Sequence, residues 1–226
     1  MNKVILVSEK PWHDQLFEDL NSEKYELDCI RIENKEKLTY EFCKEFSPDW
    51  IFIPHWSYLI PEDIFKNFRC VVFHMTDLPY GRGGSPLQNL IVRGHTKTMV
   101  SAISVSADVD AGDVYLKRTL SLHGTAEEIF IRSSKIIEKM INVIILENPK
   151  PQKQTGDVVK FKRRKPEDGD ISKLSIMEEV YDYIRMLDCE GYPKAFIETE
   201  NFKFEFNRAS LKADKSIKAD VRISKK

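Results

Sequence analysis

The stretch from Cys70 to Asp113 holds the side chains best suited to acid–base chemistry. An apolar strand there ends at His74, and a loop rich in glycine and proline follows it. A histidine in that place is a titratable group facing a loop whose glycines permit close backbone approach. A second strand ends in an acidic turn that contains Asp108, Asp110 and Asp113. The alternatives are a core histidine bonded to the backbone and a solvated hairpin tip.

The same turn raises the question of a metal ion. Three carboxylates within six residues are compatible with weak divalent-cation binding, but the chain has no EF-hand pattern and no His or Cys ligand spacing. The cysteines are far apart in the sequence and form no CxxC pair, so we expect neither a zinc site nor a disulfide framework; they are Cys29, Cys43, Cys70 and Cys189. We predict reduced, mostly buried thiols and no metal.

Short apolar runs alternate with helical patterns in the first part of the chain. This order predicts an α/β fold with an open, mostly parallel Rossmann-like sheet, whose ligands bind beyond the carboxyl ends of the strands. His55 and His74 both fall at such ends. The expected strands cover residues 3–8, 25–32, 49–53 and 71–73, and the expected helices cover 12–20, 38–46 and a short segment from 61.

The rest of the chain predicts three parts. Residues 1–150 form the main domain, 151–174 form a linker or substrate-side loop rich in Lys, Arg, Pro and Gln, and 175–226 form a small α+β subdomain. Thr125 and Glu128 make a capping box that starts a long helix. The remaining expected elements are helices over 86–93, 126–146 and 175–187, and strands over 99–109, 114–122, 195–198, 202–206 and 217–223.

Composition and net charge indicate whether a membrane or a nucleic acid is an expected partner. The chain has 226 residues, is 42% hydrophobic and 31% charged, and carries a formal net charge of −1. These values are typical of a soluble globular protein without a membrane span, and they give no electrostatic reason to expect a nucleic acid. The N-terminus reads as a first strand rather than a signal peptide, so we expect a cytoplasmic protein.

Considered together, the two segments around His74 and Asp110 resemble the formyltransferases that use N10-formyltetrahydrofolate, a family that includes methionyl-tRNA formyltransferases and sugar N-formyltransferases. In that family a histidine precedes a Ser-Leu-Leu-Pro-x-x-Arg-Gly-x-x-Pro loop, and an Asp-x-Gly-Asp turn follows later. This chain matches the loop with Thr76, Leu78-Pro79, Arg82-Gly83 and Pro86, and the turn with Asp110-Ala111-Gly112-Asp113. Downstream, Arg163–Gly169 and Tyr192–Phe196 are similar to the family's Arg-x-x-Pro-Glu-Asp-Gly and Tyr/Trp-Pro-x-Ala-Phe motifs.

The resemblance implies that His74 and Asp110 are catalytic, and it exposes one departure. The family places an asparagine two residues before the histidine to polarise the formyl carbonyl, whereas this chain has Val72. His55, Ser57 and Asn89 are the nearest polar candidates for a replacement. We prefer His55, because strand-end loops of one parallel sheet converge on one crevice; a histidine packed beside Trp56 is the alternative.

The resemblance also implies binding residues. Main-chain groups of two loops would pair with the pterin of the folate, and an Arg-Gly pair would shape the wall near the formyl group; the residues are Trp56, Ser57, Tyr58, Leu59, Arg82, Gly83, Ala107, Asp108 and Val109. Some of these side chains could equally be ordinary packing or bracing residues. On placement alone, the candidates for substrate binding are Lys10, Trp12, Met75, Thr76, Asp77, Tyr80, Arg163 and Arg164.

The expected reaction is transfer of the formyl group to an amine. The short C-terminal region and the low net charge favour a nucleotide-linked amino-dideoxy sugar as the substrate, as in the synthesis of surface glycans. Methionyl-tRNA and glycinamide ribonucleotide are the enzymatic alternatives. With Val72 in place of asparagine, a non-catalytic folate- or nucleotide-sugar-binding protein is the alternative of another class. Exposed strands in the C-terminal subdomain could pair across a two-fold axis, as in a homodimer.

Overall fold

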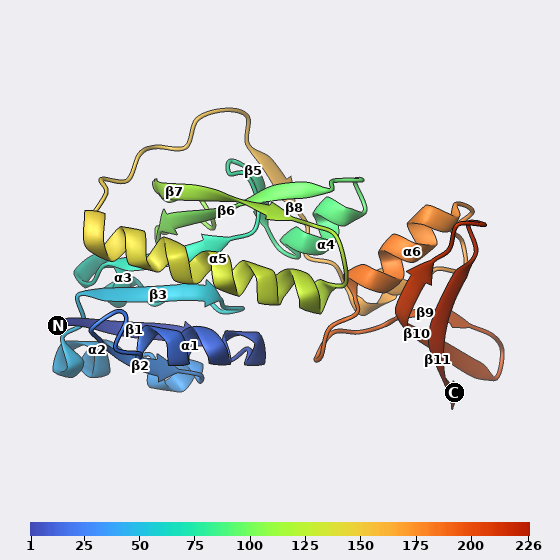
Figure 1. The fold of residues 1–226 in the computed structure, drawn as a ribbon, viewed down its shortest axis with the longest axis horizontal. Helices are drawn as coiled ribbons and strands as arrows, with labels where there is room; N and C mark the ends of the chain where they lie inside the picture. Colours follow the sequence, from blue (N-terminus) through green and yellow to red (C-terminus); the bar gives the residue numbers. More distant parts are fainter. The chain divides into compact units, whose positions relative to one another are not determined.

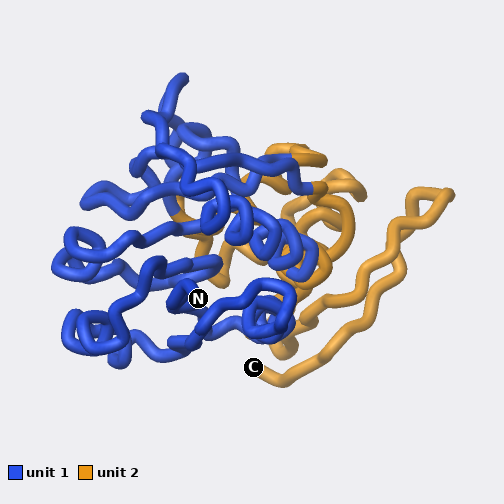
Figure 2. Tube along the Cα trace, turned by 60° about the vertical axis from the view of Figure 1, so that its left-hand side comes forward, with its two compact units in different colours: residues 1–83, 98–120, 131–160 blue, residues 84–97, 121–130, 161–226 orange.

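The computed structural model describes all residues from 1 to 226 and divides into two compact units. Unit 1 comprises residues 1–83, 98–120 and 131–160, and unit 2 comprises residues 84–97, 121–130 and 161–226 (Figure 2). Both units are therefore assembled from separate stretches of the sequence. The predicted domains, at 1–150, 151–174 and 175–226, are continuous stretches, and that division stays a prediction.

Unit 1 is built around a six-stranded sheet. The strand order is β2-β1-β3-β4-β6-β7. β1 runs parallel to β2 and β3, β3 runs parallel to β4, and β6 runs antiparallel to β4. The predicted α/β class with a mostly parallel sheet is confirmed. The strands are β1 (Asn2–Ser8), β2 (Leu27–Ile32), β3 (Trp50–His55), β4 (Cys70–His74), β6 (Lys97–Ser104) and β7 (Val114–Ser121).

Helices cover both faces of this sheet. The helices are α1 (Asp14–Leu20), α2 (Tyr40–Phe46), α3 (Glu62–Asn67) and α5 (Ala126–Glu147). Cys43 of α2 and Ile64 of α3 join one buried cluster with Ile5, Ile51 and Ile53 of the sheet. α5 runs along the other side of the strands in Figure 1. The apolar runs of β1 and β3 are buried on both faces for this reason.

The capping box at the start of α5 is confirmed. The carboxylate of Glu128 accepts the Thr125 backbone N–H at 2.8 Å, and the Thr125 hydroxyl accepts the Glu128 N–H at 3.3 Å. The two residues thereby satisfy each other's free donors at the helix end.

One predicted strand is too long, and two short strands were not predicted. The strand expected over 99–109 ends at Ser104, because the chain turns there and the Ser104 N–H bonds the carbonyl of Asp113 at 2.9 Å. The loop after His74 and the segment 151–174, predicted as a linker or substrate-side loop, each contain a strand that was not predicted: β5 (Tyr80–Gly83) and β8 (Val159–Phe161) pair as a two-stranded sheet. Both strands are short, so neither shows a periodic pattern.

Unit 2 holds α4 (Pro86–Ile91) and the C-terminal α+β part. α6 (Met177–Met186) packs on a three-stranded antiparallel sheet of order β11-β10-β9. The strands are β9 (Ala195–Glu198), β10 (Phe202–Leu211) and β11 (Ile217–Lys225). The guanidinium of Arg185 in α6 donates to the carbonyls of Leu122 and Gly124 at 2.6 and 3.0 Å. These bonds tie the helix to the 121–130 stretch of the same unit.

The structure also places the four cysteines and describes the helices that could be compared with a membrane span. All four cysteines are free and buried, and burial raises the pKa of the Cys29 and Cys70 thiols to about 12. The prediction that the cysteines are mostly buried is confirmed, and their reduced state stays a prediction. No helix combines the length and apolar character that a membrane span requires.

Candidate active site

His74 stands at the carboxyl end of β4 with its imidazole buried. Its Nε2 lies 2.8 Å from the carbonyl oxygen of Gly81. A carbonyl only accepts hydrogen bonds, so Nε2 carries the hydrogen. The Thr76 hydroxyl donates to the same oxygen at 3.4 Å. The loop that follows β4 therefore folds back over the histidine and fixes the plane of its ring.

Asp110 meets the other nitrogen of that ring. Its Oδ1 lies 3.5 Å from Nδ1 of His74, and its Oδ2 accepts the backbone N–H of Gly83 at 2.9 Å. The side chains of His74 and Asp110 are 8% and 13% exposed, so water screens their contact weakly. Asp110 has a φ of 53°, a left-handed conformation that non-glycine residues seldom adopt. Two residues predicted from separate segments thus meet in one buried pair.

His55 ends β3, the neighbour of β4. Ile53 of β3 is paired with Val72 of β4 in a parallel register, and side chains two residues apart in a strand share a face. This alternation does not carry through to His55, because the register of β3 against β1 shifts by one residue between Phe52, which pairs with Leu6, and His55, which pairs with Ser8. The indole of Trp12 lies against His55, with ring centroids 5.2 Å apart. Val72 is half-buried against the cluster that contains Ile53. His55 stays the predicted replacement for the asparagine.

Asn89 of α4, another candidate for that replacement, is occupied. Its amide nitrogen donates to the carbonyls of Gly84, Ser85 and Lys162 at 2.8–3.1 Å, and its Oδ1 accepts from Arg93 at 3.0 Å. The side chain braces the backbone of unit 2 and has no donor left for a ligand. No group of three or more His, Cys, Asp or Glu side chains is placed to hold a metal ion.

The chain is similar to known formyltransferases in both sequence and structure. The solved structure of a methionyl-tRNA formyltransferase from Clostridium thermocellum shares 50% sequence identity with the chain, covers 100% of both chains and superposes with a TM-score of 0.95. The chain belongs to the methionyl-tRNA formyltransferase-like family. A family model for the methionyl-tRNA formyltransferase C-terminal domain also matches residues 166–224. Formyltransferases of this family are enzymes that use N10-formyltetrahydrofolate.

The chain is also similar, at lower sequence identity, to other formyltransferases. A methionyl-tRNA formyltransferase of Bacillus thuringiensis is 26% identical over 181 residues, which are 75% of this chain and 57% of that protein. The chain thus spans a little over half the length of that curated relative. A 4-N formyltransferase from Francisella tularensis shares the fold, with 13% identity, a TM-score of 0.64 and coverage of 97% of this chain and 96% of its own.

The predicted folate-binding loops of this family member are open. Tyr58 and Leu59 are 44% and 81% exposed, and Val109 is 57% exposed. The indole of Trp56 is half-buried beside Tyr58, and its Nε1 is buried without a hydrogen-bond partner. A buried donor that lacks an acceptor is costly, and the ring edge of a pterin offers acceptors. The residues present therefore fit a folate, and their role as its binding site stays a prediction.

The residues predicted to bind the acceptor differ in their burial and in their contacts. Met75 and Thr76 are buried. The Thr76 hydroxyl bonds the Gly81 carbonyl in the loop over His74, so its side chain supports this loop and is not exposed to a substrate. Asp77 is exposed and pairs with Lys117 at 2.5 Å. Lys10 pairs with Glu9 at 2.9 Å. Tyr80 begins β5, and Trp12 lies beside His55.

Arg163 and Arg164 belong to unit 2, where the backbone of each is held. A Cβ on Gly84 would lie 2.6 Å from the Cβ of Arg163, so only glycine fits there. The Arg164 N–H bonds the Ser85 hydroxyl at 3.0 Å, and its guanidinium lies 5.2 Å from the centre of the Tyr183 ring. Their contact with a substrate stays a prediction.

Another buried histidine, His13, lies in the segment that follows β1. His13 is buried, and its Nδ1 lies 2.9 Å from the Ser134 hydroxyl. Burial lowers its pKa well below the ordinary value, and the neighbouring charges of His55, Arg31 and Lys10 lower it further. His13 is therefore neutral at pH 7.

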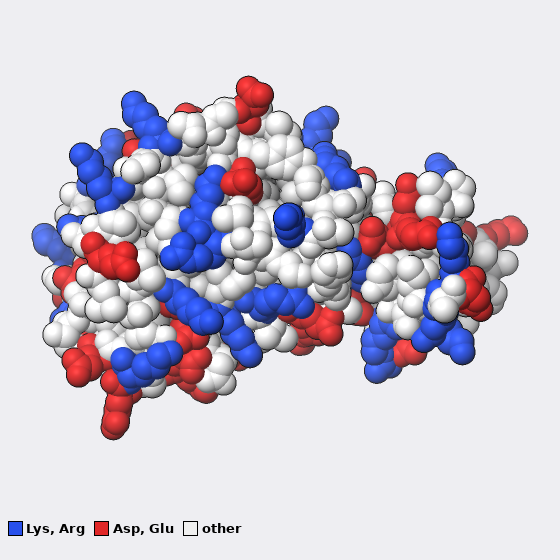
Figure 3. All heavy atoms as spheres, turned by 45° about the horizontal axis from the view of Figure 1, so that its top comes forward, with Lys and Arg blue, Asp and Glu red and all other residues white.

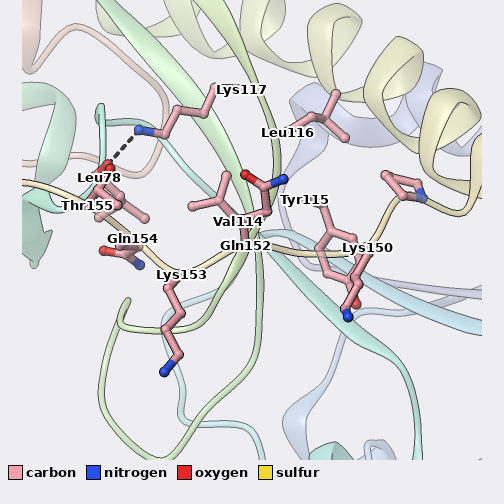
Figure 4. A pocket seen from close by; sticks show the side chains of 11 residues that line it. Leu78, Val114, Tyr115, Leu116, Lys117, Lys150, Gln152, Lys153, Gln154 and Thr155 are labelled. Atoms are coloured by element: carbon pink, nitrogen blue, oxygen red, sulfur yellow. Dashed lines mark hydrogen bonds between the residues drawn. The ribbon is translucent and has the colours of Figure 1, made fainter.

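One residue of the site escaped the sequence-based prediction. Gln154 lies in the segment that was expected to be a linker, yet its side chain contacts both Arg82 and the Asp110 turn. It lines a cavity of about 560 Å³ together with Leu78, Lys117 and Lys150 (Figure 4). A single glutamine among lysines and prolines carries no motif, so only the folded chain shows its position.

Proposed function

We propose that this chain transfers the formyl group of N10-formyltetrahydrofolate to a primary amine at His74 and Asp110. The buried contact between these two side chains is the observation that supports the proposal most. When bound, the folate supplies an electrophilic formyl carbon. The attacking amine develops an excess proton and the formyl oxygen develops negative charge, so a base and a donor are both required.

The two side chains suit these tasks. The carboxylate of Asp110 is an acceptor for the proton of the amine, directly or through water. In the free protein the Nε2–H of His74 is bonded to the Gly81 carbonyl and its Nδ1 faces Asp110. This N–H would be freed by folate binding, and it then donates to the developing oxyanion. The Gly83 N–H and the Gly81 carbonyl keep the carboxylate and the ring in place. His55 is our candidate for the second donor to the formyl oxygen.

For the acceptor we propose a nucleotide-linked amino sugar. The segment that matches the C-terminal family model, residues 166–224, contains nine Lys and Arg against thirteen Asp and Glu, a formal charge of −4. Binding of tRNA depends largely on neutralising its phosphates with basic residues. On the face drawn in Figure 3, basic side chains run across the middle of the larger part, and acidic side chains lie beside them and on the smaller part.

Methionyl-tRNA is the second candidate, because the Clostridium thermocellum and Bacillus thuringiensis proteins are named for that activity. One assay separates the two. The protein is incubated with N10-formyltetrahydrofolate and either a panel of dTDP- and UDP-linked amino sugars or charged methionyl-tRNA, and products are weighed by mass spectrometry. We expect one formyl group to be added to a sugar. Formylation of methionyl-tRNA alone would replace the sugar proposal, and folate binding without any product would indicate a binding protein.

A further inference from the structure

We propose that Gln154 is a positioning residue that holds the Asp110 turn against His74. The inference rests on the proposed function for its kinetic consequence, but its structural part stands on contacts within unit 1. The carboxamide oxygen of Gln154 accepts from Nε and Nη2 of Arg82 at 3.1 and 2.8 Å. Its nitrogen donates to the carbonyl oxygens of Asp110 and Gly112 at 2.9 and 2.8 Å.

These four bonds exhaust the side chain. A carboxamide offers two N–H donors and one oxygen with two lone pairs, and each of them is used. The orientation of the amide is also determined, because turning it over would point N–H groups at a guanidinium and an oxygen at two carbonyls. Gln154 is thus matched to its neighbours in both shape and polarity.

The Asp110 turn requires such a support. Asp110 holds a left-handed φ of 53°, and a Cβ on Gly112 would lie 1.7 Å from the carbonyl oxygen of Ser104. A backbone in this conformation persists only where its surroundings impose it. Gln154 bonds the carbonyls on both sides of Ala111, while the carboxylate of Asp110 is held from the other direction by Gly83. Asp110 is therefore fixed through its backbone and its side chain at once.

The segment that carries Gln154 is itself anchored. Gln152 and Val114, the first residue of β7, exchange two backbone hydrogen bonds at 2.7 and 2.9 Å. The side chain of Gln152 is exposed, whereas Gln154 is half-buried. Gln152 therefore provides a matched control: the same residue type, two positions away, with its backbone bonds kept after substitution.

The kinetic test compares Gln154→Ala, Gln154→Glu and Gln152→Ala in the full-length protein. Glutamate is nearly the same size and keeps an acceptor for Arg82, but it loses both donors to the Asp110 turn. We expect kcat to fall roughly 10- to 100-fold in both Gln154 variants, as for a small misplacement of a catalytic group, with KM for the folate little changed. Gln152→Ala should behave as wild type. Normal kcat in Gln154→Glu would overturn the proposal, since the bond to Arg82 would then suffice.

A second readout does not depend on activity. The Gly83 N–H donates to the Asp110 carboxylate, and its amide proton resonance reports on that bond. We expect this resonance to move upfield in Gln154→Ala and Gln154→Glu, in the direction that Asp110→Asn also moves it, and to stay in place in Gln152→Ala. An unmoved Gly83 resonance in the folded Gln154→Glu variant would overturn the positioning role even if the wild-type protein formylates no acceptor tested.

Discussion

The two predicted halves of the site differ in how firmly they are built. The half that contains His74, Asp110 and the Gly81–Gly83 backbone is buried and closed by short hydrogen bonds. The half formed by residues 56–59 and 107–109 exposes large apolar side chains and leaves the Trp56 Nε1 without an acceptor. The predicted catalytic half is therefore ordered by contacts within the protein, whereas the predicted folate-binding half presents exposed side chains.

The largest effect should come from the closed half. Asp110→Asn removes the proposed base and the negative charge beside His74 while keeping the size of the side chain. We expect turnover to fall roughly 10²- to 10⁴-fold, the usual contribution of a general acid or base, with tetrahydrofolate affinity retained. Single-turnover kinetics and calorimetric titration measure the two quantities. Asp157→Asn, an exposed carboxylate, is the control, and an equal loss there would contradict the assignment.

Gly112→Ala tests whether the closed half depends on the tight turn. The added methyl would lie 1.7 Å from the Ser104 carbonyl oxygen, so the turn must shift. We expect about 1–3 kcal/mol less stability, as for overpacking of a dense site, together with reduced turnover. Gly94→Ala is the matched control, because its φ is also positive at 75° but no atom lies within 4 Å of the new methyl. Equal unfolding midpoints for the two variants would show that the turn adapts.

His55→Ala probes the border between the halves. If His55 supplies the donor that the family's asparagine provides elsewhere, kcat should fall about 10²- to 10³-fold, the usual loss on removal of one donor to a developing oxyanion. Val72→Asn restores the family's residue and should recover part of the loss in the double variant. Unchanged kcat in His55→Ala would mean that another group donates to the formyl oxygen.

Trp56→Phe should give the smallest effect, confined to the open half. Phenylalanine keeps an aromatic ring but removes the indole N–H that has no partner in the free protein. We expect tetrahydrofolate affinity to fall several-fold, corresponding to about 0.5–1.5 kcal/mol for one hydrogen bond, while kcat with saturating folate is unchanged. Fluorescence titration measures the affinity. A large fall in kcat would mean that the two halves are not independent.

How much the sequence could predict differs between these halves as well. His74 and Asp110 lie in motifs with fixed spacing, and the alternation of apolar runs predicted the sheet that brings them to one edge. Gln154 was not predictable, because its role arises from a contact across more than forty residues with the carbonyls of the turn. β5 and β8 were missed for a related reason, since strands of three or four residues are defined by pairing rather than by periodicity.

The most direct test of the central claim follows the formyl group itself. N10-formyltetrahydrofolate carrying a carbon-13 formyl label is mixed with the protein and an amino-sugar acceptor, and the label is observed by NMR. We expect a formamide resonance on the acceptor with the wild-type protein and its near absence with Asp110→Asn. Label that stays on the folate with the wild-type protein across the full panel of amines, or transfer that proceeds equally well with Asp110→Asn, would contradict it.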